Sequence, residues 1–416
     1  AVQELVNKGL IMAGHDISAG GLIITLLEMC FSNMEGGMEI SLNKIKEDDI
    51  IKILFAENPG IVIQVKDKHK EEVKKILEDA GIGYVKLGKP TEERHILVEK
   101  GDATYQFGID YLRDVWYSTS YLLDRKQSMN GCAKKRFENY KKQPLEFVFD
   151  KSFTGKLSQF GLNPDRRTPT GIKAAIIREK GTNGEREMAY MLYLAGFDVK
   201  DVTMTDLVSG RETLEDINFI VFCGGFSNSD VLGSAKGWAG AFLFNPKAKA
   251  ALDNFYARED TLSLGVCNGC QLMIELNLIN PDFTQKAKML HNDSHKFESN
   301  FVGVTVPMNR SVMFGSLSGS KLGIWVAHGE GKFSLPYHED KYNVVLKYSY
   351  DEYPGNPNGS DYSVAGLASP DGRHLAMMPH LERSCFPWQN AYYPADRIKN
   401  DQITPWMEAF VNARKW

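Results

Sequence analysis

Alternation of short apolar strands with helices in the second half of the chain constrains its fold most strongly. The pattern predicts four strands, over residues 172–177, 198–202, 215–223 and 262–266, and three helices, over residues 184–195, 248–255 and 268–276. Strands separated by helices of roughly 10–15 residues are typical of a parallel sheet that helices cover on both faces. The sequence therefore predicts an α/β domain. After it, residues 301–333 are expected to be rich in strands, and residues 364–378 are expected to form a hairpin.

The first 125 residues mix shorter elements and predict a compact α+β domain. Helices are expected over 2–9, 20–31, 68–81 and 112–123, and strands over 60–65, 84–88 and 94–98. Residues 134–142 are dense in Lys and Arg and poor in apolar side chains. We therefore expect three parts: a domain over 1–125, a connector over 126–168 and the α/β domain over 169–416.

Composition excludes several classes of protein. The 416 residues are too many for one ordinary domain, and the net charge of -4 argues against a nucleic-acid surface. No apolar run approaches the ~20 residues of a membrane-spanning helix. Six irregularly spaced cysteines favour a reducing, cytoplasmic setting over a disulfide scaffold. The chain begins at Ala1, without Met and inside a helix-like stretch, so we expect it to be a piece of a longer polypeptide.

The sharpest chemical motif is Gly265-Val266-Cys267-Asn268-Gly269, between a predicted strand and a predicted helix. The form G-x-C-x-G there is typical of a nucleophile elbow with cysteine in place of serine. The start of the helix favours the thiolate, which is the nucleophilic form of the side chain. The alternative is an inert cysteine buried at a strand end, since free cysteine is among the most buried residue types.

A cysteine nucleophile needs a base and a group that orients the base. His380 follows an apolar strand, and Glu382 lies two residues further on, where an extended segment would place both side chains on one side. The alternative is a surface histidine in a charged turn. His328 is the rival base, with Glu330 at the same spacing, although its flanking glycines suggest a loop near a bound ligand.

Two further groups of residues could bind ligands. The backbone N–H groups of Gly225 and Asn268 follow neighbouring strands and could converge as an oxyanion site, although two glycines at a strand end are also a plain turn. Near the N-terminus, Asp16 suits Mg²⁺ and Ser18 suits a phosphate at a helix start. From spacing alone, a helix cap at Ser18 is the better interpretation.

The motifs together resemble one family. The segments HDISAGGL (15–22), LRDVWYSTSYLLDRKQ (112–127), FCGGFSNSDVLGSAKGWA (222–239), GVCNGCQLM (265–273), HGEGKF (328–333), YPGNPNGS (353–360) and PWMEAFVNARKW (405–416) occur in the order found there. The chain resembles the C-terminal part of the large phosphoribosylformylglycinamidine synthases, also called formylglycinamide ribonucleotide amidotransferases, of purine biosynthesis. The resemblance implies a class I glutaminase domain with a flavodoxin-like parallel sheet. An α+β synthetase C-terminal domain, similar to aminoimidazole ribonucleotide synthetase, would precede it.

The resemblance also implies roles for the residues. Cys267 would attack glutamine and form a thioester, His380 would be the acid/base, and Glu382 would orient it. Asp16 would bind Mg²⁺ and Ser18 a nucleotide, which reverses the preference for a cap. The implied reaction is ATP-dependent amidation of formylglycinamide ribonucleotide, with ammonia from glutamine passing to a synthetase site that lies largely outside this chain.

Two departures from the family pattern and two rival functions stand beside this interpretation. Leu381 and Cys223 occupy positions where the family usually has proline, so we expect an effect on the rate rather than on the mechanism. One rival is a glutaminase subunit that serves another acceptor, against which the fused first 125 residues argue. The other is a catalytically silent scaffold, against which the retention of Cys267, His380 and Glu382 argues.

Overall fold

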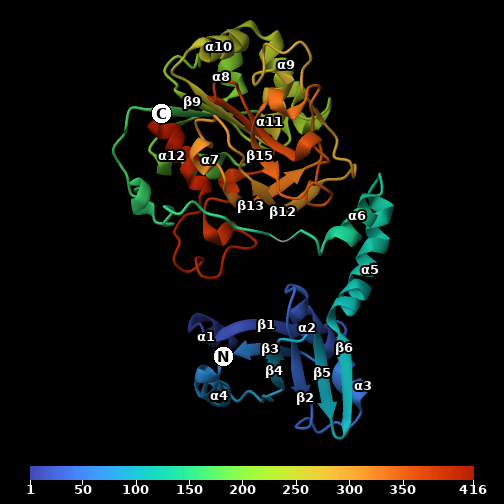
Figure 1. The fold of residues 1–416 in the computed structure, drawn as a ribbon. Helices are drawn as coiled ribbons and strands as arrows, with labels where there is room; N and C mark the ends of the chain where they lie inside the picture. Colours follow the sequence, from blue (N-terminus) through green and yellow to red (C-terminus); the bar gives the residue numbers. More distant parts are fainter. Residues whose placement is uncertain (144) are drawn as a thin grey trace. The chain divides into compact units, whose positions relative to one another are not determined.

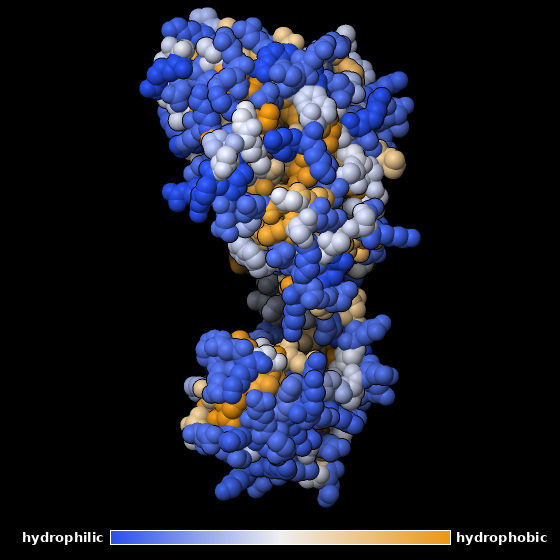
Figure 2. All heavy atoms as spheres, turned by 90° about the vertical axis from the view of Figure 1, so that its left-hand side faces the viewer, coloured by the Kyte–Doolittle hydropathy of each residue, from blue (hydrophilic) through white to orange (hydrophobic). Residues whose placement is uncertain are grey.

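The computed structural model describes residues 1–143 and 145–416, which form two compact units, Ala1–Leu123 and Asp124–Trp416. Figure 1 shows the elements of each unit. On the face that Figure 2 shows, both units are mostly hydrophilic, and apolar side chains gather in patches on each. In the described residues, no helix is both long and apolar enough to span a bilayer.

The first unit contains two small sheets and several short helices. Strands β1 (Ile11–Ile17) and β3 (Gly60–Val65) pair antiparallel, and a four-stranded sheet has the order β4-β2-β5-β6 (Gly88–Thr91, Gly37–Ser41, His95–Lys100, Ala103–Gly108). The helices are α1 (Val2–Asn7), α2 (Gly21–Phe31), α3 (Ile50–Phe55), α4 (Lys70–Asp79) and the start of α5 (Ile109–Gln127).

The core of this unit lies between α2 and the four-stranded sheet. Leu22, Ile23 and Leu26 of the helix share a buried cluster with Ile96 and Val98 of β5. The α+β expectation is confirmed. Of the three predicted strands, 60–65 and 94–98 correspond to β3 and β5, but within 84–88 only Gly88 enters a strand, and residues 82–87 are irregular. Strands β1, β2 and β6 and helix α3 were not predicted.

The second unit is built on a nine-stranded mixed sheet of order β13-β12-β15-β16-β17-β10-β9-β7-β8. The expected parallel half is there: β7 (Lys173–Arg178), β8 (Asp198–Thr203), β9 (Phe219–Phe222), β10 (Leu262–Val266) and β17 (His374–Met377) all run parallel. Strands β9 and β10 are buried along their whole length, as continuous apolar runs between two helical layers should be.

The other half of the sheet is antiparallel. It consists of β12 (Glu298–Thr305), β13 (Lys321–His328), β15 (Asn343–Tyr348) and β16 (Val364–Ala368). Strands β16 and β17 form the predicted hairpin and join this half to the parallel half. Short strands β11 (Lys288–Leu290) and β14 (Lys332–Ser334) pair separately.

Helices cover both faces of the large sheet. Helices α7 (Glu185–Ala195) and α12 (Trp406–Lys415) pack together on one face, and α9 (Lys236–Phe244), α10 (Pro246–Ala257) and α11 (Asn268–Glu275) lie on the other (Figure 1). Helix α8 (Met204–Ser209) packs on α10. The prediction missed α8, which has only six residues, and α9.

The segment expected as a connector carries structure of its own. Residues 124–168 fall within the second unit and include helix α6 (Cys132–Asn139). Arg136 of this helix donates to Asp124 at 3.0 Å and to Glu298 at 2.8 Å, and Lys296 donates to Asp124 at 2.7 Å. The Arg136 guanidinium also hydrogen-bonds to the Tyr353 hydroxyl. These partly buried ion pairs attach the end of α5 to the segment 292–298.

Candidate active site

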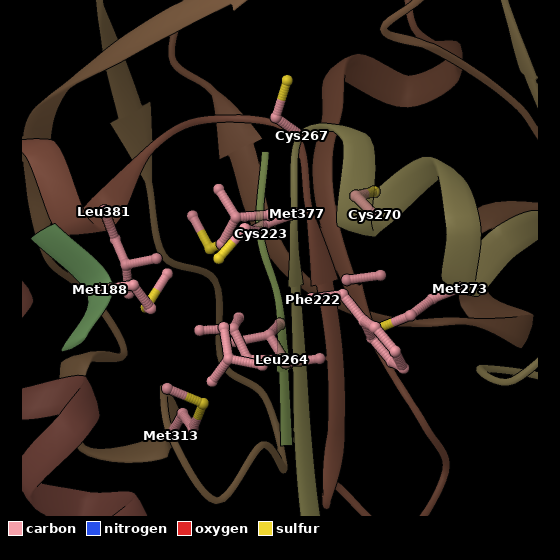
Figure 3. Packing of buried hydrophobic residues seen from close by; sticks show 14 of the residues in the cluster. Met188, Phe222, Cys223, Leu264, Cys267, Cys270, Met273, Met313, Met377 and Leu381 are labelled. Carbon is pink, nitrogen blue, oxygen red and sulfur yellow. The ribbon is translucent and has the colours of Figure 1, made fainter. Parts of the chain in front are cut away.

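Cys267 occupies the sharp turn between β10 and α11. Its backbone has φ 53° and ψ -106°, which is a strained conformation for a residue with a side chain. Two hydrogen bonds hold the turn. The N–H of Cys267 donates to the carbonyl of Met377 at 2.9 Å, and the N–H of Gln271 donates to the carbonyl of Cys267 at 3.0 Å. Figure 3 shows the sulfur pointing away from the packed apolar side chains below the turn. The predicted elbow geometry is therefore present.

Glycines beside this turn allow close approach of neighbouring groups. A Cβ on Gly269 would collide with the backbone of Phe222 in β9. A Cβ on Gly224 would lie 2.8 Å from Cε1 of His380 and 3.4 Å from Cβ of Cys267. Gly224 thus contacts both the cysteine and the histidine, and the side chains of Cys267 and His380 lie on either side of it.

His380 and Glu382 form a buried pair. The imidazole Nδ1 lies 2.6 Å from Oε1 of Glu382, and both residues are 2% exposed. His380 itself is extended, whereas Glu382 lies in a short 3₁₀ turn over Leu381–Arg383. The backbone N–H of His380 donates to the carbonyl of Trp325 at 2.8 Å, which fixes the start of this turn. The expected proximity of the two side chains is therefore present.

The charges of this pair support each other. Burial alone would lower the pKa of His380, but the charges of Glu382 and Cys267 outweigh it and raise the pKa to about 10. Burial alone would raise the pKa of Glu382, but the His380 imidazolium, and to a smaller extent Arg383, lower it. The site therefore favours a protonated His380 beside an ionised Glu382.

Arg383 lies directly behind the pair. Its Nε is 3.7 Å from Oε1 of Glu382, and its Nη2 donates to Oδ1 of Asn183 at 2.7 Å. Gly184 follows Asn183 at φ 83°, and a Cβ there would lie 3.1 Å from Nη2 of Arg383, a close contact that this side chain would have to relieve by shifting. The sequence analysis did not select Arg383 or Asn183. The signal for Arg383 was its place directly after Glu382 in the motif HLER, whereas Asn183 lies far away in the sequence and had no such signal.

The rival base, His328, has no such partner. It is 2% exposed at the end of β13, and among the described residues neither ring nitrogen has a hydrogen-bond partner. Burial, with a smaller effect of the His380 charge, lowers the pKa of His328 to about 3. Glu330 does not orient it, because its carboxylate accepts from the N–H of Ser234 at 3.3 Å. Of the two histidines, only His380 therefore has the carboxylate partner that the predicted base requires.

The two expected oxyanion donors lie near the cysteine. Asn268 is the first residue of α11, where a backbone N–H has no acceptor within the helix. Gly225 follows Gly224 and has φ 119°. Both of its neighbours are hydrogen-bonded: the Gly224 carbonyl accepts from the N–H of Asn183, and the N–H of Phe226 donates to the carbonyl of Gly181. Their joint role as an oxyanion site stays a prediction.

Two carboxylates lie near the first turn of α11. The carboxylate of Asp230 is 3.4 Å from the Ser234 hydroxyl, and the N–H of the same serine donates to Glu330. Burial and the charge of Glu330 raise the pKa of Asp230. Gln271 of α11 donates to the Glu330 carbonyl at 2.8 Å, which ties this segment to the turn that carries Cys267. Sequence reasoning named Glu330 only as a possible partner of His328.

The N-terminal candidates lie in the other unit. Asp16 is in β1 with a side chain that is 73% exposed, and Ser18 follows the strand and is exposed. The cap interpretation of Ser18 is wrong, because Gly20 is the N-cap of α2 and no side chain caps the helix. Among the described residues, no group of three or more His, Cys, Asp or Glu could hold a metal ion. Asp16 alone does not make a magnesium site.

The two departures from the family pattern are structural neighbours of the pair. Cys223 and Leu381 belong to the same buried cluster, together with Met188 (Figure 3). Leu381 is fully buried, and in the sequence it separates His380 from Glu382. Cys223 directly precedes Gly224. Apolar packing therefore supports the turn at these positions. All six cysteines of the described chain are free and buried.

Comparison with known proteins identifies the family. Residues 171–416 match the family model of the CobB/CobQ-like glutamine amidotransferase domain. The chain belongs to this family. Residues 1–100 match the C-terminal domain of AIR synthase related proteins. The order of the two domains is thus the one that the sequence motifs imply.

Curated relatives of this amidotransferase chain extend the comparison. It is 38% identical over its whole length to a probable chloroplastic/mitochondrial phosphoribosylformylglycinamidine synthase of Arabidopsis thaliana and to the phosphoribosylformylglycinamidine synthase of Homo sapiens. The chain spans only 30% and 33% of the length of these two proteins. The solved structure of PurLQS from Thermotoga maritima is 26% identical, covering 59% of this chain and 98% of that one, with a TM-score of 0.45. The family resemblance read from the motifs is confirmed.

Proposed function

We propose that residues 169–416 hydrolyse glutamine through a thioester on Cys267 and supply the ammonia to a phosphoribosylformylglycinamidine synthase reaction. The observation that carries this proposal is the buried His380–Glu382 pair, 2.6 Å apart, beside a cysteine on a strained elbow. A strained turn and a buried, oriented base are the parts that a cysteine nucleophile requires.

The proposed chemistry proceeds in two halves. The Cys267 thiolate adds to the side-chain carboxamide carbon of glutamine, and the N–H groups of Gly225 and Asn268 stabilise the resulting oxyanion. The C–N bond then breaks, its electron pair stays on nitrogen, and the proton of His380 passes to it, so that ammonia leaves. Water next adds to the thioester while His380 accepts its proton, and the C–S bond breaks to release glutamate. Glu382 holds the imidazole in orientation throughout.

Binding of glutamine would use the carboxylates beside the cysteine. Glutamine carries an α-ammonium group, which needs an anionic or carbonyl partner. Asp230 and Glu330 lie close enough for the charge of one to raise the pKa of the other. A cation between them would relieve that repulsion. We therefore assign the α-ammonium group of glutamine to this side of the site.

The remaining parts of the proposal concern the whole enzyme. The ligase would use ATP and Mg²⁺ to activate formylglycinamide ribonucleotide, in the cytoplasm, and Ser18 and Asp16 would contribute to that site. Asp16 is exposed and belongs to no group of three or more His, Cys, Asp or Glu among the described residues that could hold a metal ion, so other segments would have to complete any magnesium site. No step of the glutaminase chemistry passes through these ligands.

A link between α5 and the glutaminase site supports coupling of the two activities. The segment 292–298 is held on one side by the ion pairs of Asp124 and Arg136. On the other side, the Asn292 side chain donates to the carbonyl of His328 at 2.7 Å and accepts from the N–H of Gly331 at 3.0 Å. A change at the end of α5 would thus reach the residues beside Cys267. We expect glutamine hydrolysis by this chain alone to be slow, because the liganded synthetase is absent.

Covalent labelling tests the proposed function. An electrophilic glutamine analogue should modify Cys267, and glutamine should protect it. Peptide mapping should find none of the other five cysteines labelled, because burial raises the pKa of each of their thiols. A silent scaffold predicts no labelling. A glutaminase that serves another acceptor also predicts labelling, so the second measurement is glutamine-dependent formation of formylglycinamidine ribonucleotide by the full-length enzyme, with and without Cys267→Ser.

A further inference from the structure

Arg383 carries a buried hydrogen-bond donor that no atom of the described chain accepts. Its Nε lies 3.7 Å from Oε1 of Glu382 and 3.8 Å from Oε1 of Glu187, and it is hydrogen-bonded to neither carboxylate. Oε2 of Glu382 is also buried and has no partner among the described residues. Unsatisfied buried polar groups are costly, so a donor and an acceptor left unpaired on neighbouring residues call for a functional reason.

The position of Arg383 does not favour stability. A Cβ on Gly184, the N-cap of α7, would lie 3.1 Å from Nη2 of Arg383. The start of a helix carries a partial positive charge, which disfavours a cation there. Glu187 offsets this weakly, because its side chain is 44% exposed. The group that gains from the cation is Glu382: burial alone would raise its pKa, and the charges of His380 and then of Arg383 lower it.

An anchor on the other side holds the guanidinium in place. Nη2 of Arg383 donates to Oδ1 of Asn183 at 2.7 Å, and the backbone N–H of Asn183 donates to the carbonyl of Gly224 at 2.9 Å. Gly224 in turn contacts both Cys267 and His380. The cation is therefore fixed to the same turn that lies between the nucleophile and the base.

The second half of the proposed reaction needs a neutral His380. In the resting site, burial alone would lower the pKa of His380, but the charges of Glu382 and Cys267 raise it to about 10. An imidazole of this kind keeps its proton at neutral pH, which suits protonation of the departing ammonia but not removal of a proton from water. Once the thioester forms, the charge of Cys267 is gone, and Glu382 still holds the proton on His380.

A cation behind Glu382 weakens that hold. At the imidazole, the positive charge of Arg383 partly cancels the negative charge of Glu382, so that the proton leaves His380 more readily. The same cation keeps Glu382 ionised after the proton has left. An ionised Glu382 accepts from Nδ1–H of His380, which leaves Nε2 free to accept a proton.

The other titratable groups around these side chains leave this balance to Arg383. They are Cys223 after β9, Cys267 before α11, His328 of β13, Glu187 of α7 and Cys385. Burial raises the pKa of Cys223 and of Cys385 and lowers that of His328 to about 3, so all three are uncharged at neutral pH. The charge of Cys267 disappears in the thioester, and water screens the half-exposed Glu187.

We propose that Arg383 is a positioning residue for hydrolysis of the thioester, acting through Glu382 so that His380 can accept the proton of the attacking water. The inference rests on the proposed glutaminase function. In this step, water adds to the thioester carbon and its proton passes to Nε2 of His380. The C–S bond then breaks, its electron pair stays on the sulfur of Cys267, and glutamate leaves. Arg383 exchanges no proton.

Accumulation of the thioester in the 416-residue chain tests this role. Wild type and Arg383→Gln would be mixed with glutamine, glutamate release would be followed, and samples quenched in acid at steady state would be weighed by mass spectrometry. Arg383→Gln should release glutamate about 10-fold more slowly, because a proton held about 10-fold more tightly leaves about 10-fold less neutral His380. It should also carry a larger fraction of glutamyl thioester than the wild type, since the first half of the reaction needs the protonated form.

The pH dependence separates this role from a structural one. The acid limb of the hydrolysis rate should lie at higher pH in Arg383→Gln, because the cation that favours loss of the proton from His380 is absent. Arg383→Lys keeps the charge and should return the limb close to its wild-type position. Asn183→Ala removes the anchor but not the charge, so its thioester fraction should lie between those of the wild type and Arg383→Gln.

Arg397→Gln is the matched control. Arg397 donates to Asp401 at 2.8 Å, and this ion pair is mostly buried, with 24% and 3% of the two side chains exposed. Neither residue takes part in the proposed reaction. The substitution should leave the thioester fraction and the acid limb unchanged, whatever it does to the melting temperature.

Different results would overturn the inference and the proposed function. Slower glutamate release by Arg383→Gln without a rise in the thioester fraction, or an equal loss in Arg383→Lys, would show that Arg383 only shapes the site and would overturn its role in hydrolysis. If melting curves show that Arg383→Gln is unfolded, Asn183→Ala decides, and an unchanged thioester fraction there would contradict the role. Absence of any thioester in the wild type would refute the glutaminase itself.

Discussion

Replacement of Gly224 by alanine should disable the reaction centre without unfolding the chain. The added methyl group would lie 2.8 Å from Cε1 of His380, 3.4 Å from Cβ of Cys267 and 3.6 Å from the carbonyl oxygen of Val266. Only the first of these distances is impossible, because carbon atoms pack at about 3.5–4.0 Å. The histidine ring is therefore the group that must move.

The size of the effect follows from that displacement. The ring has to retreat by about 0.7 Å or more to restore an ordinary contact. It cannot do so freely, since Glu382 holds it at 2.6 Å and both residues are buried. A misplacement of ~1 Å in a catalytic group can lower the rate ~10²-fold. We expect Gly224→Ala to lower the turnover of glutamine by about 10- to 100-fold, with a small change in stability.

Gly240→Ala is the control for this substitution. Gly240 lies inside α9, and the nearest atom to an added Cβ would be 3.8 Å away. It should keep full turnover and gain up to ~1 kcal/mol of stability, as alanine does over glycine in a helix. Glutamate release and urea unfolding of the three proteins provide the comparison. Wild-type turnover in Gly224→Ala would refute the account of how His380 and Cys267 are held together.

Three further predictions concern strain, pH and substrate binding. Cys267→Gly should be more stable than Cys267→Ala by about 1 kcal/mol in urea unfolding, the reverse of the usual order, because only glycine relaxes at φ 53°; an equal or opposite ranking would argue against strain at the elbow. Burial lowers the pKa of His374 to about 4 in the folded chain, below the ~6.5 of an exposed histidine. The free energy of unfolding should therefore decrease as the pH falls from ~6.5 towards 4, by up to ~1.4 kcal/mol per pH unit, because the unfolded chain takes up the proton first. Unfolding curves measured across that range should be flatter for His374→Phe, and an unchanged slope would contradict the burial argument. Glu330→Gln should raise KM for glutamine several-fold but hardly change that for glutaramate, which lacks the α-ammonium group; equal effects on both substrates would place the ammonium elsewhere.

Local patterns were sufficient to predict the parallel half of the sheet and the elbow. The strand predicted over 262–266 is β10 as observed, and the cysteine stands at the turn into α11. These features depend on a continuous apolar run and on glycines at fixed spacing, which are properties of neighbouring residues. The spacing of His380 and Glu382 also placed their side chains together, although the second residue lies in a 3₁₀ turn rather than in an extended segment.

Long-range contacts account for what the sequence did not predict. Strand β12 pairs with β13 and β15, and the isolated pairing of Trp325 with His380 attaches this antiparallel half to the reaction centre. No local pattern gives the order of such strands. His328 resembled a base in sequence because it has a glutamate two residues away, yet the structure directs that carboxylate to Ser234 instead. Only the tertiary structure supports His380 rather than His328 as the predicted base.

The most direct test of the central claim is detection of a glutamyl thioester on Cys267. The 416-residue chain would be mixed with glutamine, quenched in acid within its first turnovers, and analysed by mass spectrometry before and after proteolysis. The account predicts a glutamyl group on the peptide that contains Cys267 in the wild type, none in Cys267→Ser, and loss of the group when hydroxylamine is added. Glutamate release with no adduct at Cys267, or release by Cys267→Ser at the wild-type rate, would contradict it.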